Sequence, residues 1–117
     1  MTPLADLLQR HCRHVDGAPM APEAVAAQLA ALPDWQIAGG ALRREYRFGN
    51  YYETLAFVNA LAFMVHREDH HPDLAVSYNR CEVRFSTHSV GGISENDFIC
   101  AAKADAIFDQ RFGPATA

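Results

Sequence analysis

Basic residues are scarce in this sequence. Ten Lys and Arg stand against fourteen Asp and Glu, so the formal net charge of the 117 residues is -4. Proteins that bind nucleic acid through its phosphates carry a basic patch, which this balance lacks. Long apolar runs are also missing, because the longest uncharged apolar stretch, residues 54–65, is shorter than the ~20 residues that a membrane-spanning helix requires. We therefore expect neither a nucleic-acid partner nor a membrane partner.

Cysteine is scarce as well, and it forms no pattern of pairs. Cys12, Cys81 and Cys100 are an odd number at wide spacings, without the CxxC of a redox or zinc motif. The start of the chain does not resemble a signal peptide, since Asp6 stands where basic residues belong and no apolar segment follows. These absences argue against a disulfide-stapled secreted domain and predict reduced thiols in a cytoplasmic protein.

The sequence does contain enough apolar material for one packed domain. Half of its residues are hydrophobic and 10% are aromatic, which excludes disordered and fibrous chains. The length suits one domain rather than two. We expect a single domain over residues 1–117, with a core at about 22–112, an N-terminal extension at 1–21 and a loose tail at 113–117.

Hydrophobic periodicity predicts the order of helices and strands. Apolar residues at helical spacing predict helices, and apolar–polar alternation predicts strands. The chain is expected to contain helices at residues 3–13, 22–32, 50–70 and 94–112 and β-hairpins at 35–48 and 74–87. From residue 22 onward the order is α-ββ-α-ββ-α. It predicts an α+β fold, a two-layer sandwich in which helices cover one face of a four-stranded antiparallel sheet.

The helix expected at residues 50–70 has start and stop signals. Asn50 can accept the free N–H groups of the first turn, and Pro72 ends the helix. Its apolar surface is wide, since the stripe of Leu55, Val58, Ala62 and Val65 is extended by Phe57, Leu61 and Met64. One small domain cannot bury such a surface completely, so we expect a homo-oligomer, either a dimer or a tetramer.

Four of the six histidines fall between residues 66 and 88. His66 and His70 are four residues apart on the expected helix and so share a face, and His71 follows at its end. His88 stands at the end of the last strand, and Asp97 stands in the first turn of the last helix. A helix end, a strand end and a helix start can meet at one mouth of a sandwich, so these residues form the candidate site.

The motifs of this stretch follow one another at fixed spacings: His70-His71-Pro72, Tyr78, Ser86-Thr87-His88, Gly91-Gly92-Ile93-Ser94 and Asp97-Phe98. In these residues the sequence resembles the pterin-4a-carbinolamine dehydratase family, over roughly residues 22–110. The resemblance implies a hydro-lyase that removes water from a 4a-hydroxytetrahydropterin to give quinonoid dihydropterin. Such an enzyme recycles the pterin of aromatic amino-acid hydroxylases and is coupled to phenylalanine hydroxylase. The resemblance also implies catalysis without a metal or a cofactor.

The resemblance further implies which residues form the site. They are the catalytic and pterin-binding His70, His71 and His88. Beside them we expect substrate-binding roles for His66, Pro72, Tyr78 and Asp97. The residue types suit the reaction, because the departing hydroxide needs an acid and the proton on pterin nitrogen 5 needs a base. Imidazole, with an ordinary pKa near ~6.5, can serve in either role.

Three of these residues also have other interpretations. Asp97 fits a capping box opened by Ser94, which is a structural role. Tyr78 lies on the apolar face of its strand, as core residues do. His66 stands where the family often carries an acid, so it either replaces that acid or takes no part.

Other functions remain open beside the dehydratase. Two triplets could bind a metal ion, His66, His70 and His88 or His11, Cys12 and His14, although a complete ligand set is not apparent. A metal there would indicate a small metallohydrolase. The other alternative is a non-catalytic binding module of the same fold, because animal members of the family also act as a dimerisation cofactor of a homeodomain transcription factor.

Overall fold

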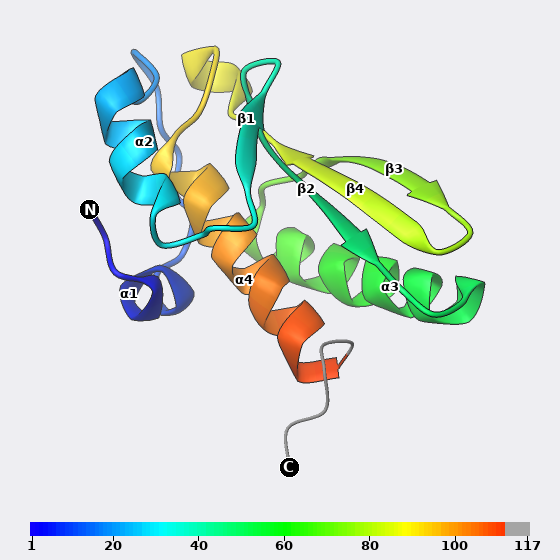
Figure 1. Cartoon of the computed structure of the whole chain (residues 1–117). Coiled ribbons are helices and arrows are strands. Elements are labelled where there is room, and N and C mark those ends of the chain that lie inside the picture. The colour runs from blue at the N-terminus through cyan, green and yellow to red at the C-terminus, as the bar shows by residue number, and fades with distance from the viewer. Residues whose placement is uncertain (112–117) are drawn as a thin grey trace.

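The computed structural model describes residues 1–111, which fold into helices around one antiparallel sheet (Figure 1). The helices are α1 (Leu4–Gln9), α2 (Pro22–Leu29), α3 (Tyr51–Glu68) and α4 (Glu95–Arg111), with a short 3-10 helix η1 (His88–Val90). The strands are β1 (Gln36–Ala38), β2 (Ala41–Arg47), β3 (Asp73–Ser77) and β4 (Arg80–Phe85). The sheet has the order β1-β2-β4-β3, and all neighbouring strands are antiparallel. The α+β fold expected from the sequence is confirmed.

One face of the sheet is covered and the other is open to solvent. Along β4 the side chains of Cys81, Val83 and Phe85 are fully buried, whereas Glu82 and Arg84 between them are partly exposed. Helices α3 and α4 pack against the sheet and against each other, and α1 packs against α4 (Figure 1). Strand β4 therefore shows the apolar–polar alternation of a sheet with one buried face.

Both expected hairpins are present. Gly39 and Gly40 join β1 to β2 with φ angles of 59° and 76°, the positive values that a tight two-residue turn requires and that glycine adopts without strain. The second turn consists of Tyr78 and Asn79, one residue earlier than the sequence indicates. As a result, β3 and β4 pair from Ser77 opposite Arg80 to the open end of the hairpin.

Helix α3 begins as expected but turns a different face to the core. Asn50 Oδ1 accepts the backbone N–H of Glu53 at 2.9 Å and caps the first turn. The fully buried apolar side chains are those of Phe57 and Leu61, whereas Ala62 of the expected central stripe is exposed. The other members of that stripe, Leu55, Val58 and Val65, are half-buried at its sides.

A buried polar cluster fixes α4 against β2. Asp105 Oδ1 accepts hydrogen bonds from Trp35 Nε1 at 3.0 Å, Arg44 Nη1 at 2.6 Å and Tyr46 Oη at 2.5 Å. Burial raises the pKa of the Tyr46 hydroxyl, and the neighbouring Asp105 carboxylate raises it further, so this hydroxyl remains a donor. The cluster holds α4 in one position on the sheet, and with it the first turn of α4.

The chain after α1 does not continue as a helix. Residues 10–16, here called the N-terminal strap, run in extended or irregular conformation, so the helix expected at 3–13 ends early. The Cys12 N–H donates to Glu68 Oε1 at 2.7 Å. The Arg13 N–H donates to Asn96 Oδ1 at 3.1 Å, and Asn96 Nδ2 donates back to Arg13 O at 2.6 Å. The strap is thereby bound to the end of α3 and the start of α4.

No helix within residues 1–111 is long and apolar enough to cross a membrane. The expected stop of the last helix at Gly113 and Pro114, and the tail that begins there, lie outside the described residues.

Candidate functional site

His70 is positioned by the end of α3. Asp69 adopts a left-handed conformation with φ 53°. The N–H groups of Asp69 and His70 donate to the carbonyls of His66 and Val65, both at 3.2 Å. This pattern of two bonds terminates a helix, so α3 ends at Glu68 rather than at about His70, and it ends before the proline predicted to stop it is reached. The left-handed residue turns the His70 side chain away from the helix surface.

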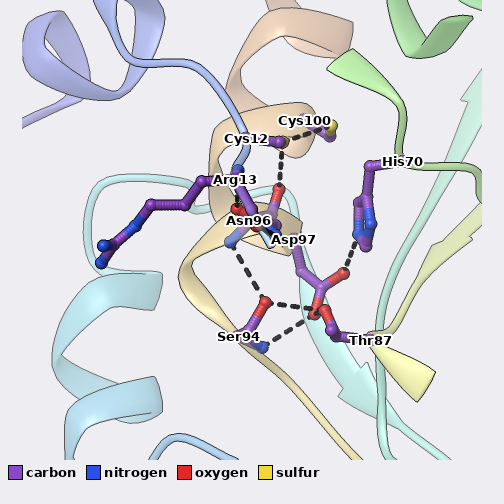
Figure 2. A network of polar contacts seen from close by, with 8 residues as sticks. All are labelled: Cys12, Arg13, His70, Thr87, Ser94, Asn96, Asp97 and Cys100. Atoms are coloured by element: carbon purple, nitrogen blue, oxygen red, sulfur yellow. Dashed lines mark hydrogen bonds and ion pairs between the residues drawn. The ribbon is translucent and has the colours of Figure 1, made fainter. Parts of the chain in front are cut away.

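Asp97 holds the His70 ring. Its carboxylate has no exposed surface, and Oδ1 lies 2.6 Å from His70 Nε2 (Figure 2). Its other oxygen, Oδ2, accepts from Thr87 Oγ1 at 2.9 Å and from the Ser94 N–H at 2.8 Å. The bond to Ser94 is the capping box expected from the sequence, so Asp97 both caps α4 and orients His70. Since a carboxylate only accepts, His70 Nε2 carries the hydrogen and Nδ1 is free to accept a proton.

The end of β4 supports the same ring. The His70 imidazole stacks on Phe85, with ring centroids 6.0 Å apart and an interplanar angle of 11°. Two residues later the Thr87 hydroxyl reaches Asp97 and also contacts Ser94 Oγ at 2.7 Å. Phe85 thus packs on the face of the His70 ring, and the Asp97 carboxylate accepts from its Nε2. Only 12% of the His70 side chain remains exposed.

His71 and His88 lie together at the open end of the β3–β4 hairpin. Both are exposed, and their ring centroids are 6.2 Å apart. His88 begins η1, a short loop closed by mutual backbone hydrogen bonds between Thr87 and Gly92 at 2.7 and 3.3 Å. The three histidines predicted as catalytic therefore lie at one end of the sheet. The His70 side chain is largely buried, whereas His71 and His88 are at the surface.

A cavity of about 230 Å³ lies beside His70. The strap forms one wall. The C-terminal end of α3, the N-terminal end of α4 and η1 form the other wall. Ser89 Oγ donates to Val15 O at 2.5 Å and links the strap to η1. The N-terminal extension therefore lines a cavity beside His70, which the sequence did not indicate.

Glu68 anchors the strap from beneath. Its buried carboxylate accepts from Lys103 Nζ at 2.6 Å, from the Cys12 N–H at 2.7 Å and from His11 Nδ1 at 3.0 Å. Burial alone would raise the pKa of Glu68, but the hydrogen bonds from Lys103, Cys12 and His11 outweigh burial and lower it to about 2. Glu68 is thus an ionised structural anchor close to the cavity.

The remaining predicted site residues are placed less centrally. Tyr78 is 64% exposed at the closed end of the β3–β4 hairpin, where its ring stacks on Tyr51 at a centroid distance of 6.3 Å. It is therefore not a core residue, and within one chain it is at the opposite end of the hairpin from the histidines. His66 is exposed on the last turn of α3, and the helix end removes His70 from the face they were expected to share. Pro72 is half-buried between the histidine pair and β3.

The side-chain positions do not support either of the two metal-binding triplets considered from the sequence. Among residues 1–111 no three His, Cys, Asp or Glu side chains gather as a group that could hold a metal ion. His11 contacts Glu68, and His14 Nε2 lies 3.7 Å from Asp16 Oδ2 on the exposed strap. The predicted clip with Cys12 is therefore not formed.

Sequence reasoning assigned no role to two side chains that the structure places beside His70 and Asp97. Thr87 was visible in the motif Ser86-Thr87-His88, and its place at a strand end next to the Asp97 helix start could have indicated a hydrogen bond. Glu68 lies two positions before His70, and on a continuous helix this spacing gives the two side chains different helical angles, so no pattern linked them. The left-handed turn between the two residues makes that helical angle irrelevant.

Comparison with protein families and known proteins gives one consistent match. The model of the family described as Pterin 4 alpha carbinolamine dehydratase matches residues 18–107. A relative from Nitrosospira multiformis is 49% identical over 109 residues, covering 92% of this chain and 96% of its own. Another from Chromobacterium violaceum is 55% identical over 104 residues, covering 88% and 96%. Both bear the provisional name pterin-4-alpha-carbinolamine dehydratase.

Two solved structures share the fold. A crystal structure from Brucella melitensis, described as a transcriptional coactivator/pterin dehydratase, has a TM-score of 0.73 and 31% identity, covering 76% of this chain and 97% of that chain. A pterin dehydratase-like protein, described as a RuBisCO assembly factor in the alpha-carboxysome, has a TM-score of 0.52 and 26% identity, covering 62% and 84%.

Proposed function

Because the chain belongs to the pterin 4 alpha carbinolamine dehydratase family, we propose that it removes water from a 4a-hydroxytetrahydropterin and releases quinonoid dihydropterin. The observation that carries this proposal is the buried Asp97 carboxylate on His70, with the exposed pair of His71 and His88 beside it. Burying an ionised carboxylate costs free energy unless a hydrogen-bond partner compensates it. A carboxylate paired with an imidazole is a common arrangement in acid–base catalysis.

In this proposal His70 acts as the base. Asp97 accepts the hydrogen on Nε2, so the lone pair of the neutral imidazole is on Nδ1. Nδ1 takes the proton from pterin nitrogen 5, and Asp97 stabilises the imidazolium that forms. Thr87 and the Ser94 N–H keep the Asp97 carboxylate in place while the charge changes.

The pair of His71 and His88 supplies the acid. Both rings are exposed at the mouth of the site, where a flat heterocycle can approach them. A protonated imidazole there donates its proton to the oxygen on carbon 4a as the carbon–oxygen bond breaks, and water departs. Each of the two proton transfers is typically worth ~10²–10⁴-fold in rate.

The test is the rate of carbinolamine dehydration by the purified protein. We expect His70→Ala and His88→Ala each to lower kcat by ~10²-fold or more, because each removes a proton-transfer group. Glu23→Gln is the control, since this exposed residue of α2 does not line the cavity beside His70. A His70→Ala/His88→Ala variant that is folded by circular dichroism and still turns over at the parent rate would contradict the mechanism.

The alternative is a binding protein of the same fold without catalysis. The observation that favours it is the likeness to the two solved structures, whose descriptions include a transcriptional coactivator and an assembly factor. The same assay separates the two functions. If the folded parent protein does not accelerate dehydration above the spontaneous rate, the enzyme hypothesis is wrong and the binding-protein hypothesis takes its place.

We further expect a homo-oligomer. Apolar side chains are exposed on the edge strand β3, at Leu74 and Val76, and on α3, at Phe63. A largely apolar groove of about 610 Å³ runs along α1, α3 and α4. These surfaces suit a second copy of the chain. Light scattering at micromolar concentration should give at least twice the monomer mass, and a monomer mass would refute this expectation.

A further inference from the structure

Two of the three cysteines lie side by side although 88 positions separate them in the sequence. Cys12 is on the N-terminal strap and Cys100 is on α4, and their Sγ atoms are 3.4 Å apart (Figure 2). The sulfur atoms of a disulfide are ~2.05 Å apart, so bond formation needs an approach of only about 1.4 Å. Residues 1–17 precede the family match, so Cys12 lies outside it.

The two thiols are not equivalent. Cys12 Sγ lies 3.6 Å from Asn96 O, which accepts its S–H. The hydrogen bond with Cys12 and then burial raise the pKa of the Cys100 thiol, so Cys100 keeps its proton.

Only one of the two thiols can be reached from solvent. Cys12 is half-buried and lines the cavity of about 230 Å³ beside His70. Cys100 is fully buried behind it. A small neutral oxidant that enters the cavity therefore meets Cys12 first and has Cys100 directly behind the point of reaction.

We propose that Cys12 and Cys100 are a redox-active pair that a small peroxide converts into an intramolecular disulfide. The Cys12 sulfur attacks one peroxide oxygen: an S–O bond forms, the O–O bond breaks, and the leaving hydroxide takes the thiol proton to become water. The Cys100 sulfur then attacks Cys12: the S–S bond forms, the S–O bond breaks, and the hydroxide leaves with the Cys100 proton as a second water. The two thiols together lose two electrons, and the peroxide gains them.

The disulfide would fasten the strap to the catalytic end of α4. Cys100 lies one helical turn after Asp97, which holds His70 (Figure 2). In the reduced protein the strap is held there by hydrogen bonds, such as those between Arg13 and Asn96. A covalent link adds to these hydrogen bonds at this wall of the cavity, and it closes a long loop in the unfolded chain.

Trypsin distinguishes all three cysteines, which makes the test direct. Cleavage after Lys and Arg places Cys12 in peptide 11–13, Cys81 in peptide 81–84 and Cys100 in peptide 85–103. The full chain is treated with hydrogen peroxide, alkylated, digested and analysed by mass spectrometry. We expect peptide 11–13 linked to peptide 85–103, with peptide 81–84 alkylated, and reversal by dithiothreitol. The Tm should rise by at least about 5 °C on oxidation.

Two variants complete the test. Cys12→Ser should abolish both the linked peptide and the rise in Tm. Cys81→Ala is the matched control and should retain both, since Cys81 is on β4, where burial raises its pKa to about 11. Oxidation of Cys12 to the sulfinic acid without a linked peptide would overturn the proposal. A mixture of isotopically light and heavy chains that yields mixed-mass linked peptides would overturn it as well, because the link would then be intermolecular.

Discussion

His70 Nε2 and Asp97 Oδ1 lie 2.6 Å apart, although 27 positions separate the two residues in the chain. The contact joins the end of α3 to the first turn of α4, and the carboxylate that makes it is fully buried. A buried carboxylate with three donors has a fixed position, so the orientation of the His70 ring follows from the packing of α4.

Asp97→Asn should lower kcat by about 10²-fold with little change in KM. The amide can turn its NH₂ group toward His70, which forces the hydrogen from Nε2 to Nδ1 and removes the base. Steady-state kinetics of the folded variant measure the effect. Asp109→Asn, on the exposed last part of the same helix, is the control and should behave as the parent. Parent kinetics in Asp97→Asn would show that Asp97 only caps α4.

Thr87→Val should destabilise the fold by about 1–3 kcal/mol, because Asp97 Oδ2 and Ser94 Oγ each lose a buried hydrogen-bond partner. Thr87→Ser keeps the hydroxyl and should recover most of the loss and the parent kcat. Urea unfolding and kinetics of the two variants check this. Equal stability of Thr87→Val and Thr87→Ser would show that the hydroxyl does not support the carboxylate.

The substrate-binding role of His66 remains a prediction. If it donates a hydrogen bond to substrate, His66→Ala should lose ~3- to 30-fold in turnover, less than the loss of an acid or base. His66→Glu restores the acid that the family often carries there and should keep activity. Because His66 is exposed on α3, neither change should alter stability. If both variants match the parent in turnover, His66 is no part of the site.

The pH dependence of stability should report on Glu68. Its pKa is lowered to about 2 in the folded protein, from an ordinary value of 4.5, so the ionised carboxylate stabilises the fold above pH 4.5. This contribution is lost as the pH falls from about 4.5 toward about 2. Glu68→Gln should therefore have a lower Tm than the parent at pH 7, and the difference should shrink below pH 4.5.

The matched control for this series is Glu23→Gln, an exposed acid on α2. Its Tm should follow that of the parent at every pH. A constant difference between Glu68→Gln and the parent from pH 7 to pH 3 would show that the charge of Glu68 does not stabilise the strap.

Local patterns predicted most of the fold. The Gly39-Gly40 turn, the alternation along β4 and the caps at Asn50 and Ser94 depend on residues close in sequence, and the structure confirms each of them. The gathering of His70, His71 and His88 also followed from their positions at a helix end and a strand end.

The remaining features depend on contacts that no local pattern records. A left-handed Asp69 is favoured only because the chain must leave α3, whereas the four-residue spacing of His66 and His70 favoured a continued helix. Helical spacing extended the first expected helix to residue 13, whereas backbone groups and a few polar side chains hold residues 10–16 as the strap. Tyr78 shares a strand face with Leu74 and Val76, which favoured a core position as the alternative to substrate binding, but the hairpin turn places it in solvent.

The strand register of the β3–β4 hairpin determines the distance between His71 and His88. Asp73 lies opposite Arg84 at its open end. His71 stands two residues before Asp73, and His88 stands four residues after Arg84. A slip of the register by one residue would turn Val83 and Phe85 out of the core, which the free energy of burial forbids. The spacing of His71 and His88 is thus set by side chains that touch no substrate. Changes in the two-residue turn at 78–79 leave that spacing intact, whereas a single insertion within β4 would separate the two imidazoles.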